Sequence, residues 1–433
     1  MPKFTGIIFL FVILHIPLAI ADDRSSIEGQ LSHYIMSQQQ EQLLLLEKLV
    51  NVNSGTDNIA GVHRVGEILR PSLEQLGFKT YWIEQPSNMQ RAGTLVAEHR
   101  GHKGKRLLLI GHLDTVFPSN SPFQHFERHG NLATGPGVID DKGGDVVILY
   151  ALKALQAIHA LDGSTITVIL TGDEEDSGKP TSISRKPLLE AARHSDLALD
   201  FEWAITQDTA TIARRGIRNW EIKAHGNEAH SSEIFQKQVG DGAIYELARI
   251  LSAMRTELAG ELYLSLNPGL ILGGTAIYND LSESHGTAFG KGNVVAKIAM
   301  AKGDLRFLSS EQKISAENKI TLIVGQHLPG TTAIVHFQDG IPAMPPTDAN
   351  RELLKKYSAV SNALGYGLVK ALSPGLRGAG DISHIASLVS ANLAGLGPVG
   401  TGAHSVKETI SVTSLPIQTE RAALLIYRLI MIS

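Results

Sequence analysis

The sequence contains no cysteine in its 433 residues. This excludes disulfides, thiolate metal sites and a cysteine nucleophile, and the chain therefore gains nothing from an oxidising compartment. An excess of positive charge is also missing, because 39 Lys and Arg against 43 Asp and Glu give a formal net charge of −4. Without a basic surplus, nothing indicates nucleic acid or an anionic membrane as a partner.

The composition excludes a disordered or collagen-like chain. Hydrophobic residues make up 43% of the sequence and charged residues 19%, as in a globular protein with a sizeable core. At roughly 100–200 residues per domain, the length predicts about two to four structural units.

Long apolar runs are missing except at the N-terminus. Lys3 is the only charged residue before Asp22, and the apolar stretch between them ends in Ala19-Ile20-Ala21. A positive start, a short apolar stretch and small residues at its end are typical of a cleaved secretory signal. The alternative, a membrane anchor, would need about 20 apolar residues, and Pro17 interrupts the stretch. We therefore predict a signal peptide at 1–21 and a soluble, exported protein, periplasmic or secreted, without a stable membrane anchor.

Predicted strands alternate with predicted helices in the first half of the chain. Short runs of apolar and β-branched residues predict strands, and apolar residues at helical spacing predict helices. The strands are 94–97, 106–110, 165–170 and 197–201, and the helices are 43–50, 62–76 and 146–158. This alternation predicts an α/β fold with a mostly parallel sheet covered by helices on both faces.

The pattern changes between residues 213 and 327. A compact α+β segment is predicted there, with strands at 217–224 and 293–307, helices at 239–256 and 310–325, and a long glycine-rich loop at 269–292. Afterwards the chain resumes with helices at 350–362, 381–390 and 415–430 and a strand at 392–395. We therefore expect a catalytic domain in two parts, 22–212 and 328–433, interrupted by an inserted domain at 213–327.

His, Asp and Glu concentrate in five short segments, most of them at the ends of predicted strands. In α/β sheets the crevice beyond the carboxyl ends of the strands is the usual functional site. The segments are 111–115, 135–144, 171–176, 200–202 and 402–405. Together they offer two histidines and several carboxylates, a ligand set that suits zinc or cobalt. The sequence has neither a His-Glu-x-x-His zinc helix nor a Gly-x-Ser-x-Gly elbow.

Each segment also has a simpler interpretation. His112 and Asp114 point the same way on an extended chain and would suit a metal ligand with its orienting carboxylate, yet such a pair alone is more often part of a surface loop. The adjacent Asp140 and Asp141 could cap the following helix or bridge two cations, whereas a phosphate loop would have another spacing. The acids of 173–176 could form a solvated turn, or supply one ligand and one free base.

Taken in order, the five segments resemble the di-zinc metallopeptidase family that contains carboxypeptidase G-type glutamate carboxypeptidases, aminoacylases, succinyl-diaminopimelate desuccinylases and tripeptidase T. The motifs that carry the resemblance are Gly-His-x-Asp-Thr, Gly-x-Gly-x-x-Asp-x-Lys-Gly-Gly, Asp-Glu-Glu, Phe-Glu and Gly-x-His-Ser. The match covers nearly all of the mature chain. It implies a catalytic domain interrupted by a lid that also forms a homodimer.

The resemblance implies two zinc ions per chain, with cobalt as a possible substitute. His112 and Glu202 would hold one ion, Glu175 and His404 would hold the other, and Asp140 would bridge the two.

Two acids, Asp200 and Glu202, compete for one of these ligand positions. Asp200 lies two residues before Glu202 and would face the same side of an extended chain. The family places this acid after an aromatic or apolar residue, as in Phe201-Glu202, which favours Glu202.

Five further residues receive roles from the resemblance. Asp114 would orient the first histidine ligand, and Glu174 would be the general base. In the lid, His230 would reach the partner subunit's site and support the developing oxyanion. Asn293 and Arg306 would hold the carbonyl and the carboxylate of the substrate.

These roles predict hydrolysis of an amide bond beside a free carboxylate, in small peptides or N-acyl amino acids, with a glutamate carboxypeptidase-like enzyme as the first choice. Glutamate-specific members are expected to use a further cation, but segment 337–342 offers an acid and apolar residues, so strict glutamate specificity is not expected. Three alternatives stay open: an aminoacylase or dipeptidase of the same family, a member that has lost catalysis, and an exported two-domain small-molecule binding protein.

Overall fold

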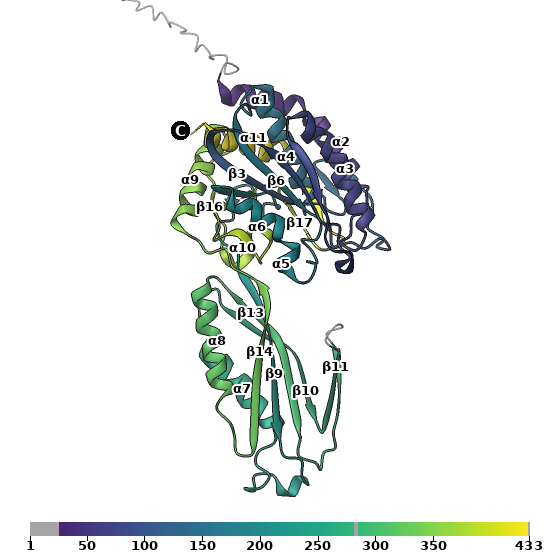
Figure 1. Cartoon of the computed structure of the whole chain (residues 1–433), viewed down its shortest axis with the longest axis vertical. Helices are drawn as coiled ribbons and strands as arrows, with labels where there is room; N and C mark the ends of the chain where they lie inside the picture. The colour runs from purple at the N-terminus through teal and green to yellow at the C-terminus, as the bar shows by residue number, and fades with distance from the viewer. Residues whose placement is uncertain (1–25, 281–284, 432–433) are drawn as a thin grey trace, which may run out of the picture.

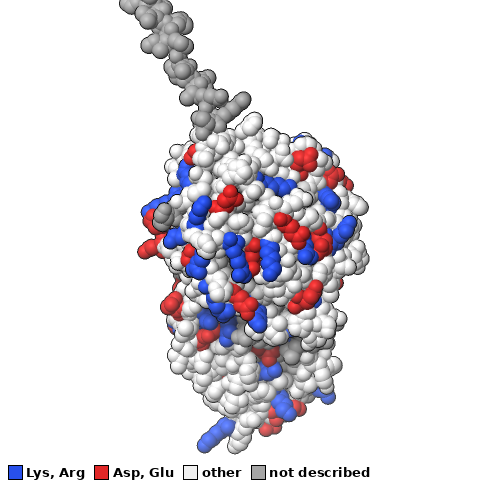
Figure 2. Space-filling model, turned by 45° about the horizontal axis from the view of Figure 1, so that its top comes forward, with Lys and Arg blue, Asp and Glu red and all other residues white. Residues whose placement is uncertain are grey.

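The computed structural model describes residues 26–280 and 285–431, and the predicted signal peptide at 1–21 lies outside them. An α/β domain and the inserted unit follow one another along the long axis of the molecule (Figure 1). On the face shown in Figure 2, charged side chains of both signs are interspersed. None of the helices in the described ranges combines the length and the apolar character that crossing a bilayer requires.

A six-stranded sheet forms the centre of the α/β domain. Its strands are Lys79–Ile83 (β1), Thr94–His99 (β2), Lys103–His112 (β3), Ser164–Thr171 (β6), Leu197–Asp200 (β7) and Ala391–Leu393 (β16). In the order β1-β2-β6-β3-β7-β16, the last four strands run parallel, and β2 is antiparallel to β1 and β6. The prediction of a mostly parallel sheet is confirmed.

Helices cover both faces of this sheet. They are Ile27–Ser37 (α1), Gln39–Val50 (α2), Ile59–Gln75 (α3), Lys142–Ala157 (α4), Thr181–Ser184 (α5), Lys186–Arg193 (α6), Asp348–Ala363 (α9), Asp381–Ile385 (α10) and Ser414–Ile430 (α11). Because side chains alternate along a strand, Leu107 and Leu109 of β3 pack into a core with α4 and α11. Leu108 and Ile110 pack into the opposite core with α6 and α10.

Two small sheets position loops around the central one. The first has the order β17-β18-β5-β4, and the second pairs β8 with β15. Their strands are Glu127–His129 (β4), Leu132–Thr134 (β5), Thr209–Ala210 (β8), Lys370–Ala371 (β15), Gly400–Thr401 (β17) and Thr409–Ser411 (β18). The turn between β17 and β18 carries His404.

The inserted unit is an antiparallel sheet backed by two helices. It comprises Gly216–Gly226 (β9), Ala243–Leu258 (α7), Ser265–Gly274 (β10), Ile298–Phe307 (β13), Ser310–Val324 (α8) and Thr331–Ile341 (β14). The strand order is β10-β13-β9-β14, and a separate core forms around Trp220, which is 1% exposed. Because β14 takes its backbone hydrogen bonds from β9, the unit continues past residue 327, where we expected it to end.

The expectation of a long loop at 269–292 is wrong. Residues up to Gly274 belong to β10, and Ala276–Asp280 (β11) and His285–Phe289 (β12) form an antiparallel hairpin. The glycines allow close backbone approach, since a Cβ on Gly274 would lie 2.2 Å from the carbonyl oxygen of Phe289. Three predicted elements are shorter in the structure, because β13 begins at residue 298, α7 begins at residue 243 and α10 ends at residue 385.

Two adjacent chain segments join the inserted unit to the α/β domain. Arg214 and Met344, one on each segment, exchange both backbone hydrogen bonds at 2.9 Å. The two segments are therefore fixed to each other at the junction. The side chain of Arg214 reaches back into the α/β domain, where it contacts the acids at the end of β7.

Candidate active site and metal centre

The predicted site residues of the α/β domain gather at one edge of its sheet. His112 ends β3, the acidic turn 173–176 follows β6, and Glu202 lies two residues after β7. These strands are neighbours and run parallel, so their carboxyl ends meet in the crevice where α/β proteins place their sites. The loop before α4 adds Asp140, and the turn after β17 adds His404.

Asp140 lies between the two histidines. Its Oδ1 is 3.1 Å from Nε2 of His112, and its Oδ2 is 3.1 Å from Nε2 of His404. The same nitrogen of His404 is 3.0 Å from Oε2 of Glu175. Ligand atoms of His112, Asp140 and Glu175 all lie within 4.8 Å of one another. A carboxylate with an imidazole at each oxygen suits a ligand shared between two cations.

This proximity keeps both imidazoles protonated when no cation is bound. Hydrogen bonds with Asp140 and Glu175 raise the pKa of His404 to about 11. Burial lowers the pKa of His112, but the carboxylates of Asp114 and Asp140 outweigh burial and raise that pKa well above its usual value. Burial raises the pKa of Glu175 to about 7. A bound cation would displace these protons.

Asp114 connects the first histidine to the acidic turn. Its Oδ1 is 3.4 Å from Nδ1 of His112, whose closer partner is the backbone carbonyl of Asp114 at 3.1 Å. The same carboxylate accepts the backbone N–H groups of Glu174 at 3.0 Å and of Glu175 at 3.2 Å. The hydroxyl of Thr56 donates to it at 2.7 Å. One buried side chain thus sets the positions of an imidazole and two carboxylates.

The acidic turn after β6 is held by the protein rather than by solvent. Asp173 is fully buried, and its Oδ1 accepts a hydrogen bond from Nη1 of Arg185 at 2.7 Å. Nε of Arg185 lies 2.6 Å from Oδ1 of Asp381, which ties the turn to α10. The turn carries Glu174, whose pKa is raised well above its usual value by burial and, in addition, by the charge of Glu202.

Two buried arginines hold Glu202. Nη1 and Nη2 of Arg214 donate to its two oxygens at 2.8 and 2.9 Å, and Nη2 of Arg377 donates to Oε2. Burial raises the pKa of Glu202, but both guanidinium groups outweigh burial and lower it. For Asp200, burial and the neighbouring Glu202 raise the pKa to about 7. Of the two acids, Glu202 is the one that stays ionised at neutral pH.

Glu408 supports the loop that carries Asp140. It is 1% exposed and accepts the backbone N–H groups of Gly137 at 3.1 Å, Ile139 at 2.9 Å and Asp140 at 3.1 Å. Burial raises the pKa of Glu408 to about 8, and the charge of Asp140 contributes. This side chain therefore fixes the backbone of Asp140, which lies between the two histidines.

The three predicted lid residues lie on the inserted unit. His230 and Val294 form a backbone bridge, which places His230 beside Asn293, and Nδ1 of His230 is 2.8 Å from the hydroxyl of Ser232. Arg306 is the second-last residue of β13, near the α/β domain, and donates to Asp304 at 2.8 Å. These contacts do not bring His230 to the predicted metal ligands of its own chain.

The fold and this geometry can be compared with known proteins. A model of the peptidase family M20/M25/M40 matches residues 108–428, which is most of the chain. The chain belongs to this family. The resemblance seen in the five sequence segments is therefore confirmed.

Similar M20 proteins span almost the whole chain. Carboxypeptidase G2 of Pseudomonas sp. (strain RS-16) is 28% identical over 388 residues, covering 88% of this chain and 87% of that protein. Succinyl-diaminopimelate desuccinylase of Acidiphilium cryptum is 27% identical over 359 residues, covering 80% and 88%. Aminopeptidase PepT of Bacillus cereus has the same fold, with a TM-score of 0.70, 17% identity, and coverage of 90% of this chain and 98% of that one.

A structure from Bacillus subtilis, described as a dinuclear metal binding peptidase of the M20 family, also shares the fold. Its TM-score is 0.64 at 15% identity, with 92% of this chain and 100% of that chain covered. As a member of the M20 family, this chain is a metallo-hydrolase, and the family implies peptide substrates. The alternative of an exported binding protein without catalysis is wrong.

Several residues of the site could not be found from the sequence. Arg185, Arg214 and Arg377 come from segments without a recognised motif. Arg185 and Arg214 each contact an acid 12 positions earlier, whereas Arg377 contacts an acid 175 positions away. Glu408 lies only four residues after His404, yet a single acid in a polar loop gives no signal of its own. The one sequence feature that could have pointed to Arg214 is the pair of adjacent arginines at 214 and 215, next to the predicted domain boundary.

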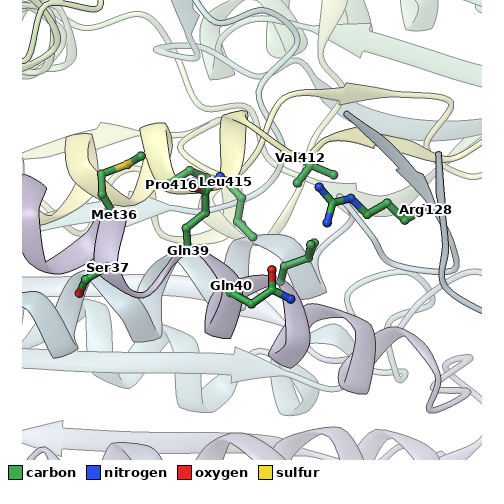
Figure 3. Close-up of a pocket in the computed structure, with 9 residues that line it drawn as sticks. Met36, Ser37, Gln39, Gln40, Arg128, Val412, Leu415 and Pro416 are labelled. Atoms are coloured by element: carbon green, nitrogen blue, oxygen red, sulfur yellow. The ribbon is translucent and has the colours of Figure 1, made fainter. Parts of the chain in front are cut away.

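One pocket of the α/β domain is unrelated to this site. It has a volume of about 350 Å³ and lies between α1, α2 and the start of α11, with Arg128 at one end (Figure 3). Its nine lining residues include no His, Asp or Glu. The pocket therefore offers no imidazole or carboxylate ligand for a cation.

We predict that Glu408→Ala destabilises the protein by on the order of 3 kcal/mol, because three buried N–H groups lose their acceptor. The midpoint of thermal unfolding measures the effect. Glu127→Ala is the control, since the Glu127 side chain is 68% exposed and surface changes usually cost less than about 0.5 kcal/mol. Equal midpoints for the two variants would contradict the support role of Glu408.

We also predict that cation binding at pH 7 releases about two protons per chain. His404, with a pKa of about 11, carries its proton at pH 7, and the raised pKa of His112 favours its protonated form as well. Imidazoles bind metals only in the neutral form. Calorimetric titration in buffers of different ionisation enthalpy measures the number. His404→Asn should remove about one of these protons, and metal affinity should fall as the pH is lowered. Release of less than one proton by the unchanged protein would show that the imidazoles are not ligands.

Proposed function

We propose that this protein hydrolyses the amide bond next to a C-terminal amino acid in small peptides or N-acyl amino acids, in the manner of a carboxypeptidase. The observation that supports this most is Asp140, with one carboxylate oxygen at His112 and the other at His404. The names of the relatives, a carboxypeptidase and a desuccinylase, both describe cleavage of an amide that has an amino acid on one side.

We propose zinc as the cation, at two positions per chain, with cobalt as a possible substitute. The donors are imidazole and carboxylate groups without a thiolate, which suits both ions. His112 and Glu202 would hold one cation, Glu175 and His404 the other, and Asp140 would contribute one oxygen to each. The lowered pKa of Glu202 favours it over Asp200, because a ligand carboxylate must be ionised.

Glu174 is the proposed general base. When bound, the two cations lower the pKa of a water molecule and polarise the carbonyl of the substrate. Glu174 takes the proton of the attacking water and passes it to the leaving amine. Its turn is fixed by Asp114 and by the buried pair Asp173 and Arg185, so the carboxylate keeps its position through both transfers.

Residues of the lid would hold the substrate. Arg306 presents a planar guanidinium that can pair with a carboxylate through two parallel hydrogen bonds, and Asn293 would bind the carbonyl side. Because His230 faces Ser232 and the segment of Asn293 within its own chain, we propose that it serves the site of the partner subunit in a homodimer. There it would stabilise the oxyanion, a role that typically contributes about 2.7–4 kcal/mol per donor.

The substrate range and the location remain part of this proposal. An aminoacylase or dipeptidase of the same family is the alternative, and a screen of N-blocked dipeptides and N-acyl amino acids with zinc-loaded protein separates the possibilities. We propose export through the signal at 1–21, to the periplasm or the medium. Absence of hydrolysis across both substrate classes, with the metal sites filled, would refute the proposed function.

We predict that Glu174→Gln keeps bound metal and fold but lowers kcat by at least about a hundredfold, because it removes only proton transfer. Elemental analysis and steady-state kinetics provide the two measurements. Glu175→Gln is the matched variant from the same turn, and it should lose metal as well as activity. Near-normal turnover in Glu174→Gln would exclude Glu174 as the base.

A mixture of two inactive variants tests the role of His230. His230→Ala should lower kcat strongly and leave zinc and dimerisation intact. In a mixed dimer with Glu174→Gln, one of the two sites combines an unchanged Glu174 with an unchanged His230 from the other subunit. We therefore expect recovery of activity after subunit exchange. Exchange without recovery would mean that His230 acts within its own chain or has no catalytic role.

A further inference from the structure

Arginine side chains form hydrogen bonds with most of the lone pairs of the Glu202 carboxylate. Nη1 of Arg214 donates to Oε1 at 2.8 Å, Nη2 of Arg214 donates to Oε2 at 2.9 Å, and Nη2 of Arg377 donates to Oε2 as well. A carboxylate offers about four lone-pair positions in all. Three are used, so one position on Oε1 is left for a metal ion.

Both guanidinium groups are fixed in place. The side chains of Arg214 and Arg377 are each 5% exposed. Nε of Arg214 donates to the backbone carbonyl of Gly378 at 2.8 Å. The guanidinium of Arg377 lies over the ring of Trp203, 4.6 Å from its centroid. Neither group is free to turn away into solvent when a cation approaches Glu202.

The partners of Glu202 and Glu175 differ in a way that matters for a cation. Glu175 contacts His404, which is itself a proposed ligand. Glu202 instead contacts two guanidinium groups, which stay charged at any accessible pH. A cation beside Glu202 is therefore repelled by two fixed positive charges that no proposed ligand role removes.

We propose that Arg214 and Arg377 make the two cation positions unequal, so that the ion held by His112 and Glu202 binds more weakly than the ion held by Glu175 and His404. The inference rests on the two-cation centre of the proposed function. Arg377 is the positioning residue that sets the difference. Arg214 alone engages both oxygens of Glu202 and orients the carboxylate, so the additional contribution of Arg377 is positive charge and a blocked lone pair on Oε2.

Titration of metal-free protein tests the proposal. Binding of Co²⁺ is followed by the absorption of the bound ion, and binding of Zn²⁺ by competition with a chelator. The unchanged protein should bind two ions in separate steps whose dissociation constants differ by at least about tenfold, a modest effect for buried charges in contact. Glu175→Gln should weaken the tighter step, which assigns that step to the position of Glu175 and His404.

Variants of Arg377 provide the decisive comparison. Arg377→Met, or Arg377→Gln should the first variant not fold, should tighten the second step by about tenfold and leave the first within about twofold. Arg377→Lys keeps the charge and should keep the two steps unequal. Arg215→Met is the matched control, because Arg215 lies at the same junction but contacts the carbonyl of Gly375 and the hydroxyl of Ser265 instead.

The outcomes separate this inference from the proposed function. Equal affinities in the unchanged protein, or a second step that stays the same or weakens in both neutral variants of Arg377, would overturn the inference even if the enzyme hydrolyses amides. Two unequal steps that converge without Arg377 would support it even if the substrate screen finds no hydrolysis. Binding of one ion by the unchanged protein and of two by Arg377→Met would support it in its strongest form.

Discussion

The buried carboxylate of Asp114 is the contact on which the geometry of the site depends. It lies at the end of β3 and accepts the backbone N–H groups of Glu174 and Glu175 at the end of β6, while its main chain and side chain face the imidazole of His112. The two strands are neighbours in the sheet. Because one side chain contacts all three, the relative position of the two strands sets the distances between His112, Glu174 and Glu175.

Around this contact the protein buries an unusual concentration of charge. Three of the buried acids have different partners: Arg185 for Asp173, two arginines for Glu202, and three backbone N–H groups for Glu408. Burial without a partner would neutralise these groups by raising their pKa. The acids therefore differ in charge: arginine lowers the pKa of Asp173 and Glu202, whereas burial raises the pKa of Glu175 to about 7 and that of Glu408 to about 8.

Much of the fold, and the proximity of His112, Asp140, Glu175 and His404, could be predicted from the sequence. Leu107–Ile110 is a continuous apolar run followed by Gly111 and His112, and this local pattern placed His112 at the carboxyl end of a strand, as the structure has it. The arginines could not be predicted in the same way. Arg377 lies 175 positions from Glu202 in the sequence, and nothing in its neighbours indicates that the chain brings the two together.

The hairpin of β11 and β12 was missed for a related reason. Glycine is the common signal of a loop, but Gly274 is required where two backbones meet closely, and a single sequence does not distinguish the two uses. The end of the inserted unit was misplaced because β14 is recognisable as part of it only through its pairing with β9. Local patterns thus specified the elements, and long-range pairing decided where they belong.

The alternation along β3 has a consequence for which changes this chain can tolerate. Leu107 and Leu109 fill one core, Leu108 and Ile110 fill the other, and His112 ends the same strand. Insertion or deletion of one residue within the strand would exchange the two sets of side chains and turn the histidine to the opposite face of the sheet. A change in the length of this strand would therefore disturb both the packing of the two cores and the position of His112. Substitutions of similar size at the four apolar positions affect packing alone.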